Sequence, residues 1–190
     1  MEILDALMNR VSTGSKRLKE PGPSDAELKQ MLQASMSAPD HGGLKPWRFI
    51  VVQGEARRAL ADLFAEHAER IDPAVEQKEI DRQRDKALGP PVTLVVVAQT
   101  VENEKVPDYE QLITAGIAAF QVQLAAYSMG YGSILVSGKK VDDGQIKTAF
   151  NVAKNERIIG FVSLGRQEAI MPKARKSAED MTHYWSPGGA

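Results

Sequence analysis

The segment from Pro107 to Met129 constrains the fold more than any other part of the chain. Large apolar residues recur along it at helical spacing, namely Ile113, Ile117, Phe120, Leu124 and Tyr127. Small residues fill much of the remaining helix surface: Ala115, Gly116, Ala118, Ala119, Ala125 and Ala126. A helix that is apolar on almost every side is typical of a buried element, and small residues let other backbones approach closely. We therefore expect a buried helix of more than about 30 Å that ends at Gly130.

The rest of the chain predicts short strands and further helices around that segment. Strands are expected at Trp47–Gln53, Val92–Ala98, Ser133–Val136 and Arg157–Leu164. Helices are expected up to Arg10, from Ser24 to before Pro39, and over Glu55–Glu69 and Asp142–Phe150. Residues 11–23 contain glycines and prolines and are expected to form a loop. The charge-dense segment Pro73–Leu88 is interpreted as a solvated helix face rather than a binding surface.

This order of elements predicts a single α+β domain over residues 1–190. We expect a sandwich with a sheet of about four strands around the buried central helix and the other helices outside. These elements leave more apolar surface than one subunit can cover, so an obligate homodimer is expected. Residues 170–190 are expected to form an extended C-terminal arm, whose Tyr184 and Trp185 also need a surface to bury them.

The composition disfavours several classes of function. Twenty-four basic residues against twenty-five acidic ones leave a net charge of −1, which argues against nucleic acid and membrane surfaces as partners. The chain has no cysteine, which excludes thiolate metal sites and cysteine nucleophiles and suits a cytoplasmic location. The three histidines, His41, His67 and His183, are too far apart in sequence to predict a metal site. Because no nucleophile–base pair stands out, we expect no catalytic side chain.

Two groups of basic residues suit an anionic ligand. Arg10 and Ser12 stand where the first helix ends, and Lys173 and Arg175 stand two residues apart in the tail. Guanidinium forks and hydroxyls are suited to phosphate oxygens, and lysine adds a point charge. The ordinary alternative is that Arg10 caps its helix and that the tail charges are solvated, and the residues alone favour this alternative.

Two loops have the composition of ligand-binding turns. The stretch APDHGGLKPW suits close approach to a ligand; its alternative interpretation is an Asp40 turn with a satisfied His41 and a core Trp47. The turn Ser137-Gly138 follows a strand, and its glycine lets the backbone come near a flat ring. A simple strand-to-helix turn is the alternative there.

Taken in order, these segments resemble the FMN-dependent nitroreductase family, in its short single-domain branch. The stretches that carry the resemblance are Asn9-Arg10-Val11-Ser12, Ser37-Ala38-Pro39-Asp40-His41, Lys45-Pro46-Trp47, Leu135-Val136-Ser137-Gly138 and Pro172-Lys173-Ala174-Arg175. The long alanine-rich helix leading into Gly130-Tyr131-Gly132 adds to the set. Together they span nearly the whole chain.

The resemblance implies a nitroreductase-like α-β sandwich with a mainly antiparallel sheet, and a homodimer with two FMN sites at its interface. The FMN phosphate would be held by Arg10 and Ser12, with Val11 between them, and by Lys173 and Arg175. The partner subunit would contribute Ser37, Pro39 and His41. The flavin ring would lie along Leu135, Val136, Ser137 and Gly138. A stretch assigned to nicotinamide-nucleotide contact corresponds to Ala125, Ala126, Tyr127, Ser128, Met129 and Gly130.

The activity implied is that of an NAD(P)H nitroreductase, an oxidoreductase. NADPH or NADH would give hydride to flavin N5, and a nitroaromatic, a quinone or a similar small acceptor would then use the same face, which gives ping-pong kinetics. Val11 replaces a second arginine, and Gly14 replaces a basic residue near flavin N1, so Lys16 or Arg17 is expected to reach that position instead. Two alternatives remain open. One is other redox chemistry on the same fold, such as dehalogenation or flavin fragmentation, and the other is a dimer without catalysis that binds or senses FMN, or holds no flavin.

Overall fold

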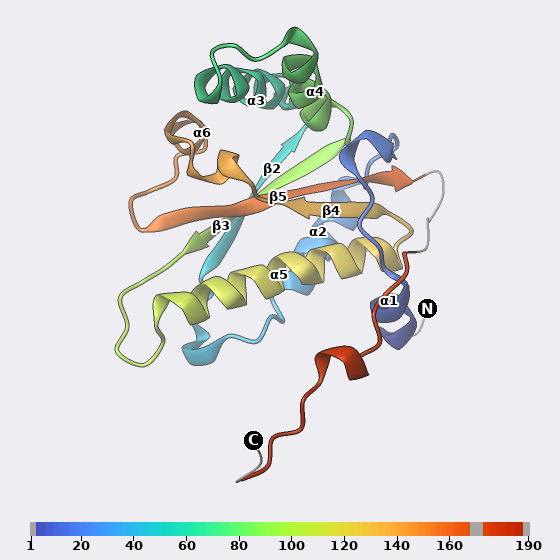
Figure 1. Ribbon diagram of the computed structural model, residues 1–190, viewed down its shortest axis with the longest axis vertical. Helices are drawn as coiled ribbons and strands as arrows, with labels where there is room; N and C mark the ends of the chain where they lie inside the picture. The colour runs from blue at the N-terminus through green and yellow to red at the C-terminus, as the bar shows by residue number, and fades with distance from the viewer. Residues whose placement is uncertain (1–2, 168–172, 188–190) are drawn as a thin grey trace.

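The computed structural model describes residues 3–167 and 173–187. An antiparallel sheet forms the middle layer, with helices on both sides (Figure 1). One side carries α3 (Ala56–Ile71), α4 (Gln77–Leu88) and α6 (Gly144–Ala149), and the other carries α1 (Ile3–Asn9), α2 (Asp25–Ser35) and α5 (Asp108–Ser128). Between residues 173 and 187 the chain runs as an extended arm with one short 3-10 turn, η4 (Glu179–Met181). None of the described helices is long and apolar enough to cross a membrane.

The α+β class and the antiparallel sheet are confirmed, with one strand more than expected. The sheet contains β1 (Leu18–Lys19), β2 (Trp47–Gln53), β3 (Val92–Gln99), β4 (Gly132–Val136) and β5 (Glu156–Gln167). The long strand β5 pairs with β1, β3 and β4, and β3 pairs in turn with β2. The two-residue β1 lies inside residues 11–23, where we predicted only a loop. Its strand forms because Leu18 is fully buried while its backbone pairs with Gln167.

Alternating side chains of the sheet build two separate cores. On one face, Leu94 and Val96 of β3 pack with Met31 of α2 and Val122 of α5. On the other face, Val95 and Val97 pack with α3 and α6, in a cluster that contains Leu60, Phe64, Ile146 and Phe161. The continuous β-branched run of β3 is therefore covered on both faces, as its sequence predicts.

The start of α2 follows its sequence signature. The Ser24 hydroxyl accepts a hydrogen bond from the Glu27 backbone N–H at 3.3 Å, and the Glu27 carboxylate accepts from the Ser24 N–H at 2.9 Å. This is the predicted capping box, which satisfies two backbone donors at the helix start. The helix then ends at Ser35, before Pro39.

The orientation of α5 differs from the expectation of a buried central helix. Its small residues face the sheet, and Ala115, Ala118 and Ala119 are fully buried. Two large residues of the predicted stripe turn outward instead, with Ile113 57% and Phe120 37% exposed, whereas Tyr127 is buried. Small side chains let the helix axis approach the sheet closely, so packing selects that face as the inner one. The sheet is thus the middle layer, and the outer face of α5 is an exposed apolar surface.

Candidate functional site

Arg10 and Arg175 meet at the end of α1, although they lie far apart in the sequence. The Arg175 guanidinium donates from Nη2 to the Arg10 carbonyl oxygen at 2.6 Å. The Arg10 guanidinium lies 5.7 Å from the centroid of the Phe120 ring on α5. Lys173 stands two residues before Arg175 on the same stretch of the arm. The structure therefore brings the first helix end and the tail to one place, but Met171 and Pro172 lie outside the described residues.

The electrostatics of this place favour an anion. Nη1 of Arg10 is buried and has no hydrogen-bond partner among the described residues. Burial, and secondly the charge of Arg175, lower the pKa of Arg10. Within residues 3–167 and 173–187, no carboxylate forms an ion pair with either arginine. Two neighbouring guanidiniums without a counter-ion make a site suited to a multiply charged oxyanion.

Strand β4 connects this electropositive site to the second predicted segment. Ser12 forms an isolated parallel bridge with Ser133, and the Thr13 N–H donates to the Ser133 carbonyl at 2.9 Å. From Ser133 the strand runs to Val136 and delivers the turn Ser137-Gly138. At the rise of a β-strand this path is about 13–17 Å long. An elongated ligand could therefore lie along β4 with an anionic end at Arg10.

The turn after β4 is open and needs glycine. Gly138 has φ 67° and ψ −168°, a backbone conformation that is essentially restricted to glycine. A Cβ atom added there would meet nothing within 4 Å, so the backbone conformation rather than crowding requires this residue. The Ser137 hydroxyl points back and donates to the Ile159 carbonyl at 2.6 Å. Leu135 packs partly against the core, and Val136 is exposed. The backbone of the Ser137-Gly138 turn is therefore open to stacking by a planar group.

A cavity of about 380 Å³ opens beside this turn. The loop residues Gly14 and Ser15, the turn Ser137-Gly138, and residues of the three strands β3, β4 and β5 line it. Its further walls are Phe64 of α3, Lys86 of α4 and Lys140, which belongs to the short 3-10 turn η3 (Lys139–Asp142). The volume lies within the usual range of small-molecule sites, which are mostly apolar with a few polar groups.

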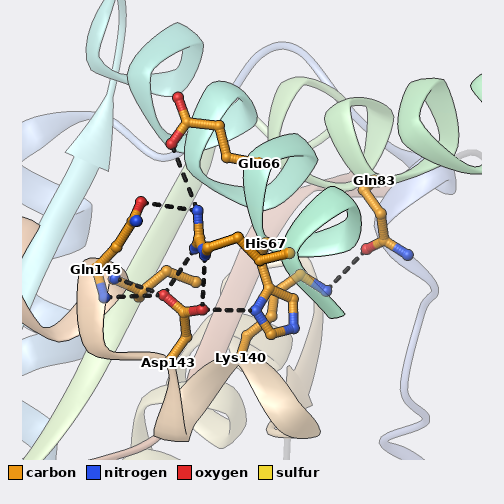
Figure 2. Close-up of polar contacts among 8 residues, drawn as sticks. Glu66, His67, Gln83, Lys140, Asp143 and Gln145 are labelled. Carbon is orange, nitrogen blue, oxygen red and sulfur yellow. Dashed lines mark hydrogen bonds and ion pairs between the residues drawn. The ribbon is translucent and has the colours of Figure 1, made fainter. Parts of the chain in front are cut away.

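Two lysines in this cavity were missed by the sequence analysis. Lys140 and Lys86 both donate from Nζ to Oε1 of Gln83, at 2.8 Å and 3.0 Å (Figure 2 shows the Lys140–Gln83 contact). We treated α4, the helix that carries Lys86, as a solvated face, yet Ile80, Gln83 and Ala87 form a buried stripe that leaves Lys86 beside it. The i, i+3, i+7 spacing of these three residues is the sequence pattern that could have indicated a buried side of this helix. We expected Lys16 or Arg17 to reach the position near flavin N1; neither residue lines this cavity, and Lys16 pairs with Asp85 at 3.5 Å.

An ion-pair network holds η3, and with it Lys140, in position. Asp143 accepts from Nδ1 of the buried His67 at 2.9 Å and from Arg70 at 2.8 Å (Figure 2). The same carboxylate caps α6 by accepting from the backbone N–H groups of Gln145 and Ile146. Despite its burial, these hydrogen bonds and the Arg70 charge hold the pKa of Asp143 well below its usual range. The segment between Gly138 and α6 is therefore anchored to α3.

The loop around His41 lies elsewhere on the chain. His41 Nδ1 lies 2.7 Å from Glu110 Oε1 at the start of α5, and Asp40 accepts from the backbone N–H groups of Leu44 and Lys45. Trp47 is buried in the core. An Asp40 turn, a satisfied His41 and a core Trp47 are the ordinary interpretation of this loop. Ser37 and Pro39 are exposed, and no described contact joins the loop to Arg10 or to Gly138.

The stretch 125–130 ends α5 and contributes mainly to packing. Ala126 and Tyr127 are buried, and the Gly130 carbonyl accepts from Arg166 at 3.2 Å. Ala125 and Ser128 share a groove of about 290 Å³ with Ser37. Met129 packs against the core that α5 and α2 share. Strand β4 lies between this stretch and the Ser137-Gly138 turn along the chain.

Most of the chain is similar to known proteins. The model of the Nitroreductase family matches residues 7–166. The protein called "Putative NAD(P)H nitroreductase YdjA" in Escherichia coli strain K12 is 37% identical over 165 residues, which cover 87% of this chain and 88% of that protein. A protein of Haemophilus influenzae with the same general name is 32% identical over 166 residues, covering 87% of this chain and 88% of its own length.

Solved structures share the fold. The nitroreductase-like family protein of Bacillus cereus superposes with a TM-score of 0.81 at 20% identity, over 97% of this chain and 96% of its own. A nitroreductase of Desulfovibrio desulfuricans, solved in complex with FMN, gives a TM-score of 0.76 at 19% identity, over 98% of each chain. At these identities the likeness concerns the fold alone.

Proposed function

The chain belongs to the nitroreductase family, and from that premise we propose that it is an FMN-dependent oxidoreductase. The proposed reaction takes hydride from NADPH or NADH and delivers it to a nitroaromatic, a quinone or a similar small acceptor in a ping-pong cycle. The names of the relatives in Escherichia coli and Haemophilus influenzae support the reductant, and the FMN complex from Desulfovibrio desulfuricans supports the cofactor. A cytoplasmic location stays a prediction.

The observation that carries this proposal is the unpaired guanidinium of Arg10. Its buried Nη1 has no acceptor, and Arg175 adds a second positive charge beside it. A buried donor without a partner is costly, and a charged one more so, which makes an incoming oxyanion the natural partner. The FMN phosphate fits this position, with the Ser12 hydroxyl and Lys173 close by in the sequence. The glycine-rich loop that holds the pyrophosphate of FAD in Rossmann folds is absent from the sequence, which favours FMN as the flavin.

The remaining site residues fit the ring system of FMN. When bound, the flavin supplies hydride acceptance and donation at N5. Gly138 offers open backbone for stacking, and Leu135 and Val136 offer apolar surface that excludes water from one side. In this proposal no side chain of the chain transfers a proton. The residues bind and orient the cofactor and adjust the charge around it.

We include a homodimer in the proposal because the chain exposes apolar surface on one side. Ile3, Leu4, Leu7 and Met8 of α1 are exposed together with Ile113 and Phe120 of α5. Tyr184 and Trp185 on the arm are 96% and 84% exposed, so they are not covered by the part of the subunit that the structure describes. A second copy would cover these surfaces and would bring its own Ser37, Pro39 and His41 toward the cofactor.

The visible spectrum of the purified protein tests the proposal. We expect a yellow protein whose extracted chromophore has the mass of FMN, and whose absorbance bleaches when NADPH or NADH is added without oxygen. Addition of a nitrofuran or a quinone should then restore the colour. A colourless protein that takes up no FMN, or one that holds FAD, would contradict the proposal. Restoration only by some other oxidant would favour different redox chemistry on this fold.

A further inference from the structure

The turn Ser137-Gly138 is held firmly on one side and weakly on the other. On the side of the sheet, the Ser137 hydroxyl donates to the Ile159 carbonyl of β5 at 2.6 Å. On the side of η3, the Val141 N–H reaches the Gly138 carbonyl only at 3.5 Å, which is long for a hydrogen bond. Glycine has more backbone freedom than any other residue, so this side of the turn needs a further support.

Asp143 supplies that support at the far end of η3. Its backbone N–H donates to the Lys140 carbonyl at 3.2 Å. Its carboxylate contacts two side chains of α3. Oδ2 lies 2.9 Å from His67 Nδ1, as Figure 2 shows, and Oδ1 accepts from Arg70 Nη2 at 2.8 Å. Only the four residues of η3 lie between Gly138 and Asp143, so these contacts limit where the Gly138 backbone can lie.

The helix that holds Asp143 is itself part of the packed core. His67 is only 4% exposed, and α3 packs through Leu60 and Phe64 into the cluster that also contains Ile146 of α6. Because an ionised carboxylate only accepts hydrogen bonds, Nδ1 of His67 carries the hydrogen in this contact. A buried ion pair adds little net stability compared with apolar residues, but it can select one arrangement of the groups around it. The cluster is therefore better suited to fixing the position of η3 than to stabilising the fold.

We propose that His67 and Arg70, acting through Asp143, are positioning residues that hold the Ser137-Gly138 turn in the arrangement that receives the planar ring of the cofactor. This inference rests on the FMN binding proposed above. Within residues 3–167 and 173–187, none of the three side chains lines the cavity beside that turn. They therefore act on the backbone of the turn and not on the ligand.

Loss of the His67 contact should lower the fraction of molecules whose turn is in the receiving arrangement. His67→Leu keeps an apolar side chain of similar size in the core but removes the donor to Asp143. The observed affinity for FMN is the intrinsic affinity reduced by the fraction of molecules that can bind. If that fraction falls to about one tenth, the dissociation constant rises about tenfold.

The test is the dissociation constant of FMN for the full chain, measured by flavin fluorescence in a titration of the apoprotein. His67→Leu should raise it about tenfold and should shift the visible absorption bands of the bound flavin. His67→Asn should stay within about twofold of the parent, because its amide N–H takes the place of the Nδ1 donor. Glu156→Gln is the matched control, since it neutralises another buried carboxylate that pairs with an arginine, at the start of β5. It should leave FMN binding unchanged.

Amide hydrogen exchange of the apoprotein gives a second readout that does not depend on FMN. The backbone amides of η3 should exchange faster in His67→Leu than in the parent or in Glu156→Gln, because the segment opens locally more often. Equal exchange of these amides in His67→Leu and in the parent would overturn the inference.

The outcomes separate this inference from the proposed function. If the parent protein binds no FMN, both fail. If FMN binds the parent and a folded His67→Leu equally well and with the same spectrum, only the positioning role is overturned. If Glu156→Gln weakens FMN binding as much as His67→Leu does, the effect is one of general stability, and the positioning role is again overturned. Should His67→Leu not fold, Arg70→Met is the second variant, because Arg70 is partly exposed, and unchanged FMN binding there overturns the inference.

Discussion

Arg175 donates a hydrogen bond to the backbone carbonyl of Arg10, and this 2.6 Å contact attaches the C-terminal arm to the end of the first helix. The contact is made by the backbone of Arg10, which leaves its guanidinium available, with a buried and unpaired Nη1. Burial, and secondly repulsion by the charge of Arg175, lower the pKa of Arg10. An oxyanion between them would turn that repulsion into attraction.

The first prediction concerns this arginine. Arg10→Ala should weaken FMN binding by about 1.5–3 kcal/mol, the usual contribution of a charge-assisted hydrogen bond. This corresponds to a roughly 10- to 150-fold higher dissociation constant in a titration of the apoprotein. Arg58→Ala is a matched control, because Arg58 is exposed on α3 and pairs only with Glu55. If the FMN dissociation constant of Arg10→Ala is unchanged, Arg10 does not bind the phosphate and only caps its helix.

The exposed face of α5 shows what periodicity can and cannot predict. The spacing correctly located the helix and its apolar character, but it did not show which side faces the sheet. Small residues such as Ala115 and Ala118 face the sheet and are buried, because their small side chains let the helix approach the sheet closely. The larger Ile113 and Phe120 were left outside. A sequence pattern gives the faces of a helix, whereas the partner of each face depends on the shape of the surface opposite.

The second prediction tests whether that face is an interface between two copies. Ile113→Asp should raise the dissociation constant of the dimer at least tenfold, by about 1.4 kcal/mol or more, because it would bury an unpaired charge. Light scattering over a range of protein concentrations measures the change. Ile71→Asp is the control, since Ile71 is exposed at the end of α3 on the other side of the sheet. If both variants remain equally dimeric, α5 does not form the interface.

The candidate site was only partly predictable from the sequence. Arg10 and Arg175 have guanidinium groups, which are suited to phosphate oxygens, and the structure brings the two residues together. Lys86 and Lys140 were missed because they come from different elements, and only the fold aligns α4 with the turn after β4. A run of charged residues on a helix is usually solvated. The position of Lys140 depends on contacts distant in sequence, with Gln83 of α4 and the Phe64 ring of α3.

The third prediction concerns the pH dependence of stability. Glu156 is buried and accepts from Arg48 Nε at 2.8 Å and from Arg48 Nη2 at 2.7 Å. These bonds, against the opposing effect of burial, lower the pKa of Glu156 to about 2. A carboxylate whose pKa is lowered by folding stabilises the protein above its unfolded pKa, and that contribution is lost as the pH falls toward 2. Glu156→Gln should therefore lower the free energy of unfolding by about 2 kcal/mol at neutral pH.

Urea unfolding at several pH values checks this prediction. The difference between Glu156→Gln and the parent should shrink as the pH falls through the range from about 4.5 to about 2. Glu55→Gln serves as the control, because Glu55 is largely exposed in its pair with Arg58 and should give a small difference throughout. A difference for Glu156→Gln that stays constant down to acidic pH would show that the charge on Glu156 contributes nothing.

The last prediction uses the C-terminal arm, which has two separable parts. Lys173 and Arg175 lie in its first part, and Tyr184 and Trp185 lie in its second, where they are almost fully exposed. Large aromatic side chains are seldom left in water at the end of an arm unless they have a partner surface. We therefore expect the second part to pack on the other subunit and the first part to hold the phosphate.

Two truncations distinguish these roles. A chain that stops after Lys176 retains Arg175, so it should bind FMN through its phosphate but should dissociate into monomers at higher protein concentration than the parent. A chain that lacks everything from Met171 onward should lose both the dimer and the yellow colour, because Arg10 then faces the phosphate without Arg175. Light scattering and the visible spectrum report the two properties independently. If the shorter chain stays dimeric and yellow, the arm supports neither the interface nor the cofactor, and the exposed face of α5 alone must account for any association.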